Sequence, residues 1–249
     1  MRHAWPCLVA LSLFPALSAA SEVVILLHGL ARSDRSMARM AEALHDEGYA
    51  VLNVDYPSRE AEIESLADTV IRQALTDEQV MRADKIHFVT HSMGGILVRQ
   101  FLATNVIERL GRVVMLGPPN RGSEVVDQMG DYQLFAAING PAGKQLGTGT
   151  NSVPNRLGPV RFELGVIAGN RSINWINSLM IDGPDDGKVS VTSTKVEGMK
   201  QHRVLPVTHP YLMKNAQVIQ ETLCFLRTGR FCTVPSEGAD DQAGSSREQ

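Results

Sequence analysis

The sequence lacks the features that mark several large classes of protein. It contains no His-Glu-x-x-His and no Cys-x-x-Cys, the spacings of common zinc sites. Gly143-Lys144 has neither the upstream glycine nor the following Ser or Thr of a phosphate-binding loop. There is also no long basic run, and the net charge is −3, which argues against a nucleic-acid partner. We therefore expect no metal ion, no cofactor and no nucleic acid.

The sequence also lacks an apolar run long enough to cross a membrane. The apolar stretch at residues 4–17 is shorter than the ~20 residues of a spanning helix, and two prolines interrupt it. A positive start at residues 1–3 and a small-residue ending at residues 18–20 complete the pattern of a secretory signal peptide. We expect residues 1–20 to be removed and the protein to be secreted or periplasmic. An uncleaved anchor is the alternative.

Cysteine is scarce, with three residues in 249. Removal of the signal peptide would take Cys7 away and leave Cys224 and Cys232. In an oxidising compartment these two can close a small loop, which would contribute roughly 2–3 kcal/mol. Two unpaired thiols are the alternative. The composition then turns to Ser, Glu, Gly, Asp and Gln, so we expect residues 233–249 to form a disordered tail.

What the sequence does contain is an alternation of short β-rich runs and helical patterns. The β-rich runs are Val23–Leu27, Tyr49–Val54, Ile86–Thr90, Arg112–Leu116, Phe162–Ala168 and Arg203–Val207. The first run is apolar throughout, as in a strand that is buried on both faces of a parallel sheet. Helical patterns between most of the runs predict right-handed crossovers. The prediction is one α/β domain over residues 21–232, with a mainly parallel sheet of about six strands and helices on both faces.

The most informative motif lies near the middle of the chain. A strand-like run over residues 85–91 ends at Ser92, and Gly94 and Gly95 begin a helical pattern directly behind it. This order is typical of a nucleophile elbow, a sharp strand-to-helix turn that exposes a serine hydroxyl. Thr90 departs from the usual glycine two positions before the serine, and its branched side chain crowds the turn. By itself the motif is equally consistent with a helix that has Ser92 near its N-cap.

A second motif follows the first predicted strand. That strand ends at His28-Gly29, and Leu30 comes next. A strand that ends in this way can direct the Leu30 N–H at a developing oxyanion, and the N–H of Met93 would be the second donor. An ordinary turn between a strand and a helix is the alternative. We expect His28 to be structural.

A serine nucleophile requires a general base and a carboxylate that orients the base. His202 and His209 flank the last predicted strand, and active residues of open α/β sheets lie beyond the carboxyl ends of the strands. That rule favours His209 as the base. In the acidic turn before the last strand, Asp186 fits best as the carboxylate, with Asp185 as the alternative. A merely solvated acidic turn is the other interpretation.

Together these motifs resemble those of a small serine lipase or esterase of the α/β-hydrolase superfamily, in the bacterial triacylglycerol-lipase-like group. The matching pieces are His28-Gly29-Leu30, Thr90-His91-Ser92-Met93-Gly94-Gly95, Gly117-Pro118-Pro119-Asn120-Arg121-Gly122-Ser123, Asp185-Asp186-Gly187 with Val189, and Thr208-His209. The resemblance extends from about residue 23 to 227. It implies Ser92 as nucleophile, Asp186 as acid and His209 as base. It also implies Leu30 and Met93 as the oxyanion donors.

Three further features bear on the expected site. Some members of this group carry an Asp directly after the histidine that ligates a structural calcium, and this chain has Pro210 there, so we expect no calcium. The irregular segment 118–159 follows the predicted strand that comes after the elbow's helix. We interpret it as a small lid or a wall of the acyl pocket, with a plain surface loop as the alternative. Trp175 and Leu179–Ile181 are candidates to line the same pocket, and a core role is the alternative for them.

The sequence thus predicts a serine hydrolase that cleaves carboxylic esters through an acyl-enzyme. Its expected partner is a small-molecule or lipid ester, with transient contact at a lipid interface. An acyltransferase with the same three residues is an alternative, and so is amide or peptide cleavage. A catalytically silent binding module is a further alternative, against which the set of Ser92, Asp186 and His209 argues.

Overall fold

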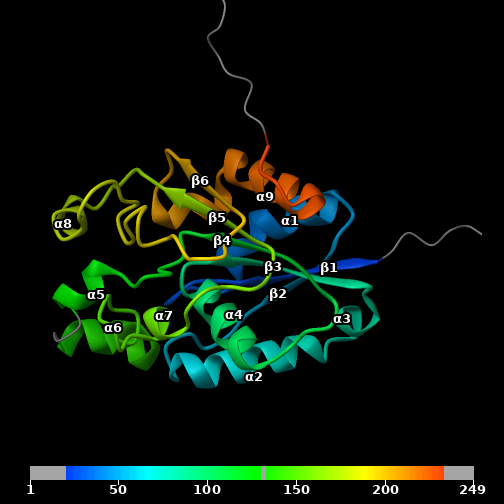
Figure 1. Ribbon diagram of the computed structural model, residues 1–249, viewed down its shortest axis with the longest axis horizontal. Coiled ribbons are helices and arrows are strands. Elements are labelled where there is room, and N and C mark those ends of the chain that lie inside the picture. The colour runs from blue at the N-terminus through cyan, green and yellow to red at the C-terminus, as the bar shows by residue number, and fades with distance from the viewer. Residues whose placement is uncertain (1–20, 130–132, 233–249) are drawn as a thin grey trace, which may run out of the picture.

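Six strands form one parallel sheet in the order β2-β1-β3-β4-β5-β6 (Figure 1). The structure, a computed structural model, describes residues 21–129 and 133–232, so the predicted signal peptide and tail lie outside the described residues. The strands are β1 (Glu22–Leu27), β2 (Ala50–Val54), β3 (Lys85–His91), β4 (Leu110–Leu116), β5 (Leu164–Gly169) and β6 (Gln201–Leu205). Each corresponds to one predicted run, and the predicted parallel sheet of about six strands with helices on both faces is confirmed.

The centre of the sheet is buried on both of its faces. Along β1, Val23, Ile25 and Leu27 belong to the core on one face, and Val24 and Leu26 belong to the core on the other. All five side chains are fully buried. The continuous apolar run of β1 therefore reflects two separate cores that share one strand.

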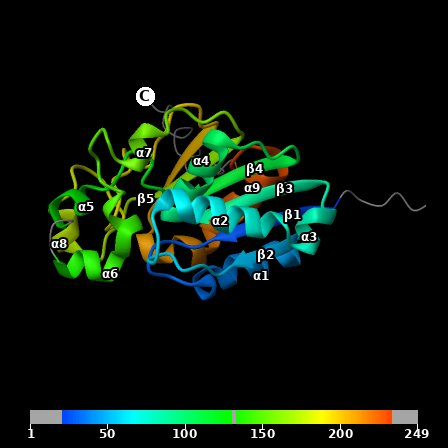
Figure 2. The same ribbon diagram turned by 90° about the horizontal axis from the view of Figure 1, so that it is seen from below.

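Helices cover both faces of the sheet. The α-helices are α1 (Ala38–Asp46), α2 (Ile63–Leu75), α3 (Glu78–Arg82), α4 (Met93–Thr104), α5 (Glu124–Met129), α6 (Gln133–Lys144), α7 (Val153–Arg156), α8 (Trp175–Ser178) and α9 (Ala216–Thr228). Two 3₁₀ helices are η1 (Asp34–Met37) and η2 (His209–Lys214). Figure 1 shows α2 and α4 on one face and α1 and α9 on the other. In both views α5, α6 and α8 lie together at the end of the molecule toward which the strands run (Figure 1 and Figure 2).

The last helix is fixed at both of its ends. Its N-cap residue Asn215 accepts hydrogen bonds from the backbone N–H groups of Gln217 and Val218. A disulfide joins Cys224, in α9, to Cys232, with the two Cα atoms 5.6 Å apart.

Within the described residues, none of the helices combines the length and the apolar character that a bilayer-crossing segment requires.

Candidate active site

Ser92 lies at a strained turn between β3 and α4, which we call the elbow (residues 90–95). Its φ is 52° and its ψ is −123°, a backbone conformation that residues other than glycine rarely adopt. The Ser92 N–H donates to the carbonyl of Leu116, 2.8 Å away, so the end of β4 holds the turn. In the described part of the chain, the only other residue besides glycine with positive φ is Ala31, which lies beside the same pocket. Strain of this kind is concentrated at functional sites.

The glycines behind Ser92 allow two close approaches. A Cβ atom added to Gly94 would lie 2.6 Å from the carbonyl oxygen of Leu27 and 2.8 Å from that of His28. A Cβ atom on Gly95 would lie 3.2 Å from the hydroxyl of Thr90. Thr90, the residue that departs from the usual motif, is fully buried, and its hydroxyl has no hydrogen-bond partner among the described residues. The space left by Gly95 therefore accommodates the branched side chain of Thr90.

Two backbone N–H groups are free near Ser92. Neither Leu30, in the turn after β1, nor Met93, the first residue of α4, donates a backbone hydrogen bond to another described residue. The first N–H groups of a helix have no partner inside the helix. These are the two groups that the sequence predicted as oxyanion donors.

His209 and Asp186 form a buried pair. The Nδ1 atom of His209 lies 2.7 Å from Oδ2 of Asp186, and the His209 N–H donates to the Asp186 carbonyl at 2.9 Å. The other carboxylate oxygen of Asp186 accepts from the N–H groups of Lys188 and Val189. Because Nδ1–H donates a hydrogen bond to the carboxylate, the ring presents the lone pair of Nε2.

The neighbouring carboxylate of Asp185 has different partners. It accepts from the hydroxyl of Ser178, at the end of α8, and from the N–H of Gly187. Asn177, also in α8, donates to the carbonyl of Gly187 at 2.9 Å. Of the two carboxylates that the sequence left open, Asp186 contacts the imidazole, and Asp185 attaches α8 to the segment we call the acid loop (residues 182–190).

One pocket of about 260 Å³ brings most of the predicted site residues together. Ser92, His209 and Leu30 all line it. Met93 is the first residue of α4, and its side chain is fully buried, so it would contribute its backbone N–H. Segment 118–159 supplies part of the wall, with Val125 and Val126 of α5 and with Leu146, just after α6. His202 lies elsewhere, with its Nε2 atom 2.8 Å from the hydroxyl of Thr194.

His91 also lines this pocket, and the sequence gave it no role. Its ring centre lies 4.7 Å from that of His209, and its Nε2 atom lies 3.1 Å from the His209 carbonyl oxygen. Burial, followed by the nearby His209, holds the pKa of His91 well below its ordinary value, so Nε2–H donates from a neutral ring. The Nδ1 atom is then a buried acceptor without a partner in the described part of the chain. The only indication of a role for His91 in the sequence was its position directly before Ser92.

His28 is a structural residue in the observed arrangement, as expected. Its Nδ1 atom is 2.8 Å from the carbonyl oxygen of Gly29, and its ring stacks on Tyr56 with centres 4.1 Å apart. The Tyr56 hydroxyl donates to the His28 carbonyl at 2.6 Å. Burial lowers the pKa of His28, so the neutral ring holds the turn after β1.

Trp175 and Leu179 do not line the pocket, in contrast to the sequence-based expectation. Trp175 is 70% exposed and Leu179 is 78% exposed, while Ile181 is buried. The hydrogen bonds from Asn177 and Ser178 turn the polar side of this short segment toward the acid loop, and its apolar side chains face away from the protein.

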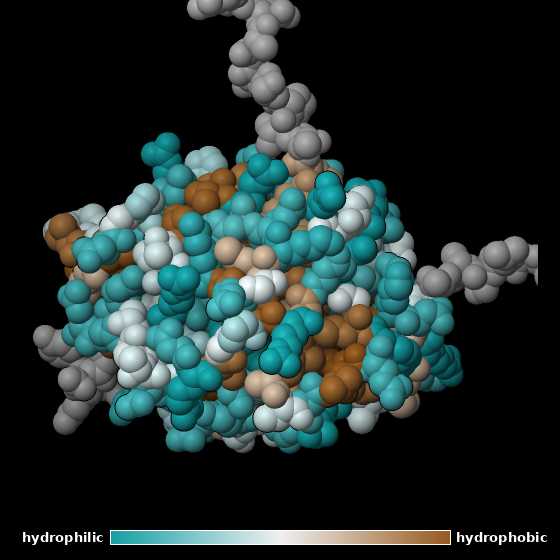
Figure 3. Space-filling view, viewed as in Figure 1, coloured by the Kyte–Doolittle hydropathy of each residue, from teal (hydrophilic) through white to brown (hydrophobic). Residues whose placement is uncertain are grey.

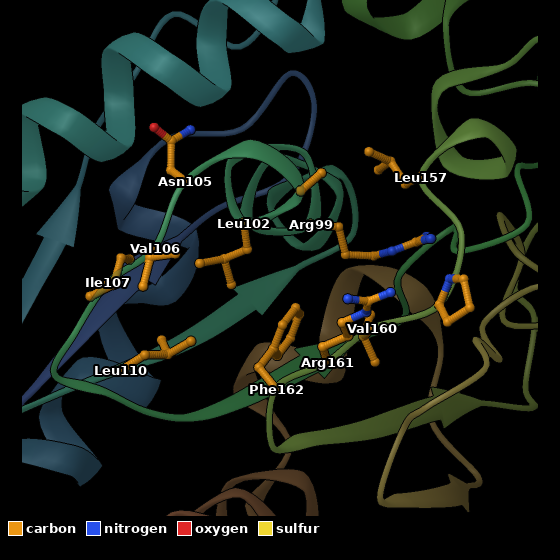
Figure 4. Close-up of a pocket in the computed structure, with 12 residues that line it drawn as sticks. Arg99, Leu102, Asn105, Val106, Ile107, Leu110, Leu157, Val160, Arg161 and Phe162 are labelled. Atoms are coloured by element: carbon orange, nitrogen blue, oxygen red, sulfur yellow. The ribbon is translucent and has the colours of Figure 1, made fainter.

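A larger hollow of about 520 Å³ lies beside the C-terminal half of α4, and both apolar and polar side chains line it, among them Phe162, Asn105 and Arg161 (Figure 4). Arg99 lies beside it, almost fully buried, and burial lowers its pKa to about 10. Its guanidinium donates to the carbonyls of Asn120, Pro154 and Gly158 and to the side chain of Asn120. Arg99 therefore fixes the loop after β4 against the loops around α7. The hollow contains none of the three predicted catalytic side chains.

Among the described residues, no group of three or more His, Cys, Asp or Glu side chains is arranged to hold a metal ion. The chemistry that the pocket offers is that of a hydroxyl on a strained turn, a buried imidazole–carboxylate pair and two free N–H groups.

Comparison with known proteins points to the same fold. The sequence model of the alpha/beta hydrolase family matches residues 24–206. Among solved structures, the mature form of the Bacillus licheniformis lipase BlEst2 has a TM-score of 0.66 at 19% identity, covering 87% of this chain and 95% of that one. The metagenomic carboxyl esterase MGS0156 has a TM-score of 0.63 at 19% identity, covering 78% and 66%. No curated protein matches the sequence.

A third similar structure is the phospholipase PlaB from Legionella pneumophila. Its TM-score is 0.59 at 20% identity, and the match covers 70% of this chain but only 46% of that one. At such identities the likeness of the three structures shows the shared fold.

Proposed function

Because the chain belongs to the alpha/beta hydrolase family, we propose that it is a serine hydrolase that cleaves carboxylic esters. The observation that carries this proposal is the 2.7 Å contact between Asp186 and His209, whose ring lines the same pocket as the strained Ser92. A serine, a histidine and an aspartate in these positions have the roles of nucleophile, base and orienting acid.

In the proposed reaction, the Nε2 atom of His209 takes the proton of Ser92 as the serine oxygen attacks the ester carbonyl. Asp186 holds the imidazole in the required tautomer and stabilises the imidazolium. The N–H groups of Leu30 and Met93 donate to the negatively charged oxygen of the tetrahedral intermediate. His209 then protonates the leaving alcohol, and an acyl-enzyme remains on Ser92.

The second half of the reaction uses the same groups. His209 removes a proton from water, the resulting hydroxide attacks the acyl-enzyme, and the carboxylic acid leaves as Ser92 regains its proton. An acyltransferase would differ only at this step, where an alcohol would replace water. Product analysis with and without an added alcohol distinguishes the two reactions.

Four exposed apolar side chains support contact with a lipid interface. They are Ile173, Trp175, Ile176 and Leu179, between 51% and 78% exposed, in and around α8. Figure 3 shows an apolar patch at the left end of the molecule, where Figure 1 places α8. Tryptophan and aliphatic residues together are favoured where one side of a segment is apolar and the other is wet. We place the transient lipid contact at this patch, next to the acid loop.

The domain and location of the protein follow from the same proposal. Residues 21–232 would form the hydrolase domain, with α5 and α6 as the wall of the acyl pocket. The disulfide between Cys224 and Cys232 and the signal-like composition of residues 1–20 support export to a secreted or periplasmic location.

A fluorophosphonate probe and a series of p-nitrophenyl esters test the proposal. We expect covalent labelling of the folded protein at Ser92 and ester hydrolysis that Ser92→Ala reduces by about 10⁴-fold or more. Ser65→Ala, on the exposed side of α2, is a control serine outside the pocket. A folded protein that neither reacts with the probe nor hydrolyses any ester would be a silent binding module.

A further inference from the structure

Two cationic side chains line the pocket that holds Ser92 and His209. Arg32 follows the turn after β1, and Lys188 follows Asp186 in the acid loop. Neither side chain forms an ion pair or a hydrogen bond with any other residue in the described part of the chain. Their charges are therefore available to a bound molecule.

No Asp or Glu side chain among the described residues lines this pocket. The nearest buried carboxylate of the site, Asp186, already accepts hydrogen bonds from two N–H groups and contacts His209. Glu60 lines an adjacent hollow that Arg32 also borders, and it makes no ion pair with Arg32. Among the described residues, Arg32 and Lys188 are thus the charged side chains that line the pocket, in a chain whose net charge is −3.

The two cations are close enough to influence each other. Burial, followed by the charge of Arg32, lowers the pKa of Lys188, while the charge of Asp186 acts in the opposite direction. The charge of Arg32 also contributes to the lowered pKa of His91, after burial and His209. Two like charges at one mouth repel each other, and an anion between them would relieve that repulsion.

Several apolar residues of the pocket come from segments other than the two that carry these charges. Val125 and Val126 belong to α5, and Leu146 lies just after α6. Leu30 packs toward α6, where its Cδ2 atom would be 3.2 Å from a Cβ on Gly143. This wall fits an apolar acyl chain, so a charged group of the substrate would belong to the alcohol part.

We propose that the preferred substrates are esters with an apolar acyl chain and an alcohol part that carries an anionic group, recognised by Arg32 and Lys188. The anionic group is a carboxylate or a phosphate, since both pair with guanidinium and ammonium groups. This inference rests on the proposed ester hydrolysis. The inference adds a substrate class that Ser92, Asp186 and His209 alone do not select.

The test uses two esters with the same acyl chain, 4-(butanoyloxy)benzoate and its uncharged methyl ester. The readout is the ratio of kcat/KM for the charged ester to that for the uncharged one. We expect this ratio to fall about fivefold in Arg32→Gln and about fivefold in Lys188→Gln, the size of an exposed ion pair. Added NaCl should lower the wild-type ratio because it screens exposed charges.

A matched control and two further substrate pairs complete the design. Arg39→Gln removes an exposed arginine outside the pocket and should leave the ratio unchanged. Butanoylglycerol with and without a phosphate on the glycerol separates a preference for phosphate from one for carboxylate. Mono-p-nitrophenyl glutarate against p-nitrophenyl pentanoate places the charge on the acyl side, and its ratio should not respond to the two substitutions.

The outcomes are distinguishable. If the uncharged ester is hydrolysed with Ser92 and the ratios do not change in Arg32→Gln or Lys188→Gln, the inference is wrong and the hydrolase proposal stands. If the substitutions change only the ratio for the glutarate and pentanoate esters, the assignment of the charge to the alcohol part is wrong. If folded wild-type protein hydrolyses neither member of any pair, the hydrolase proposal and this inference fail together. Circular dichroism confirms that each variant is folded.

Discussion

The two halves of the candidate site, the elbow and the acid loop, are held in place in different ways. The elbow lies between two buried elements, and backbone packing fixes it: Ser92 donates to Leu116, and Gly94 approaches the carbonyl of Leu27. The acid loop contains neither a helix nor a strand, and side-chain oxygens of Asp185 and Asp186 organise its backbone. The elbow is therefore a property of the fold, while the acid loop depends on individual side chains. Substitutions should expose this difference.

The largest effect is expected at the acid loop. Asp186→Ala should lower kcat for a p-nitrophenyl ester by about 10⁴-fold, because His209 would lose the group that fixes its tautomer. The adjacent Asp185→Ala is the matched control. It loosens the attachment of α8 and should lower kcat by no more than about 10²-fold, as a small misplacement does. The reverse ranking of the two rates would transfer the role of acid to Asp185.

At the elbow, the expected effect is on stability. Gly94→Ala places a methyl group against two backbone carbonyls and should lower the free energy of unfolding by about 1–3 kcal/mol. Urea denaturation measures the change. Gly149→Ala, where an added Cβ would meet no atom within 4 Å, should change it by about 0.5 kcal/mol or less. Equal stability of the two variants would contradict the close packing of α4 on β1.

The region after the acid loop should respond to pH. Burial, followed by the charge of Lys195, lowers the pKa of His202 from 6.5 to about 4. The unfolded chain therefore binds the extra proton first, and His202 costs stability as the pH falls from about 6.5 toward about 4. His202→Asn should make the loss of Tm over this range less steep. The exposed His45→Asn should not, and an identical slope in both variants would argue against the shift.

The smallest effect is expected from Thr90. Its buried hydroxyl has no partner in the described part of the chain, so Thr90→Val keeps the shape and removes an unsatisfied polar group. We expect the free energy of unfolding to rise by about 1 kcal/mol. A fall measured by urea denaturation would mean that the hydroxyl has a partner in solution.

The difference between the elbow and the acid loop also explains which features the sequence could predict. The six strands follow from local patterns, because short β-rich runs such as Val23–Leu27 alternate with helical patterns along the chain, as in a parallel sheet. The close approach of α4 to the end of β1 at Gly94 also has a local cause, because glycine has no Cβ atom to meet the Leu27 carbonyl. The roles of Ser92, Asp186, His209, Leu30 and Met93 stay predictions until activity is measured.

Other features depend on contacts that no local pattern encodes. Asp185 and Asp186 are chemically identical neighbours, and only the path of the acid loop decides which one meets His209. His91 approaches His209 across 118 residues of sequence. Trp175 is exposed because two polar neighbours, Asn177 and Ser178, bind the acid loop.

The chain order of the three site residues has a consequence for biosynthesis. A ribosome that has completed β5 has already made the elbow, but the segments with Asp186 and His209 do not yet exist. In the proposed mechanism, such a nascent polypeptide has the nucleophile but lacks its general base. In that mechanism, activity begins only when β6 has joined the sheet and η2 has brought His209 to Asp186, so synthesis of most of the domain precedes it.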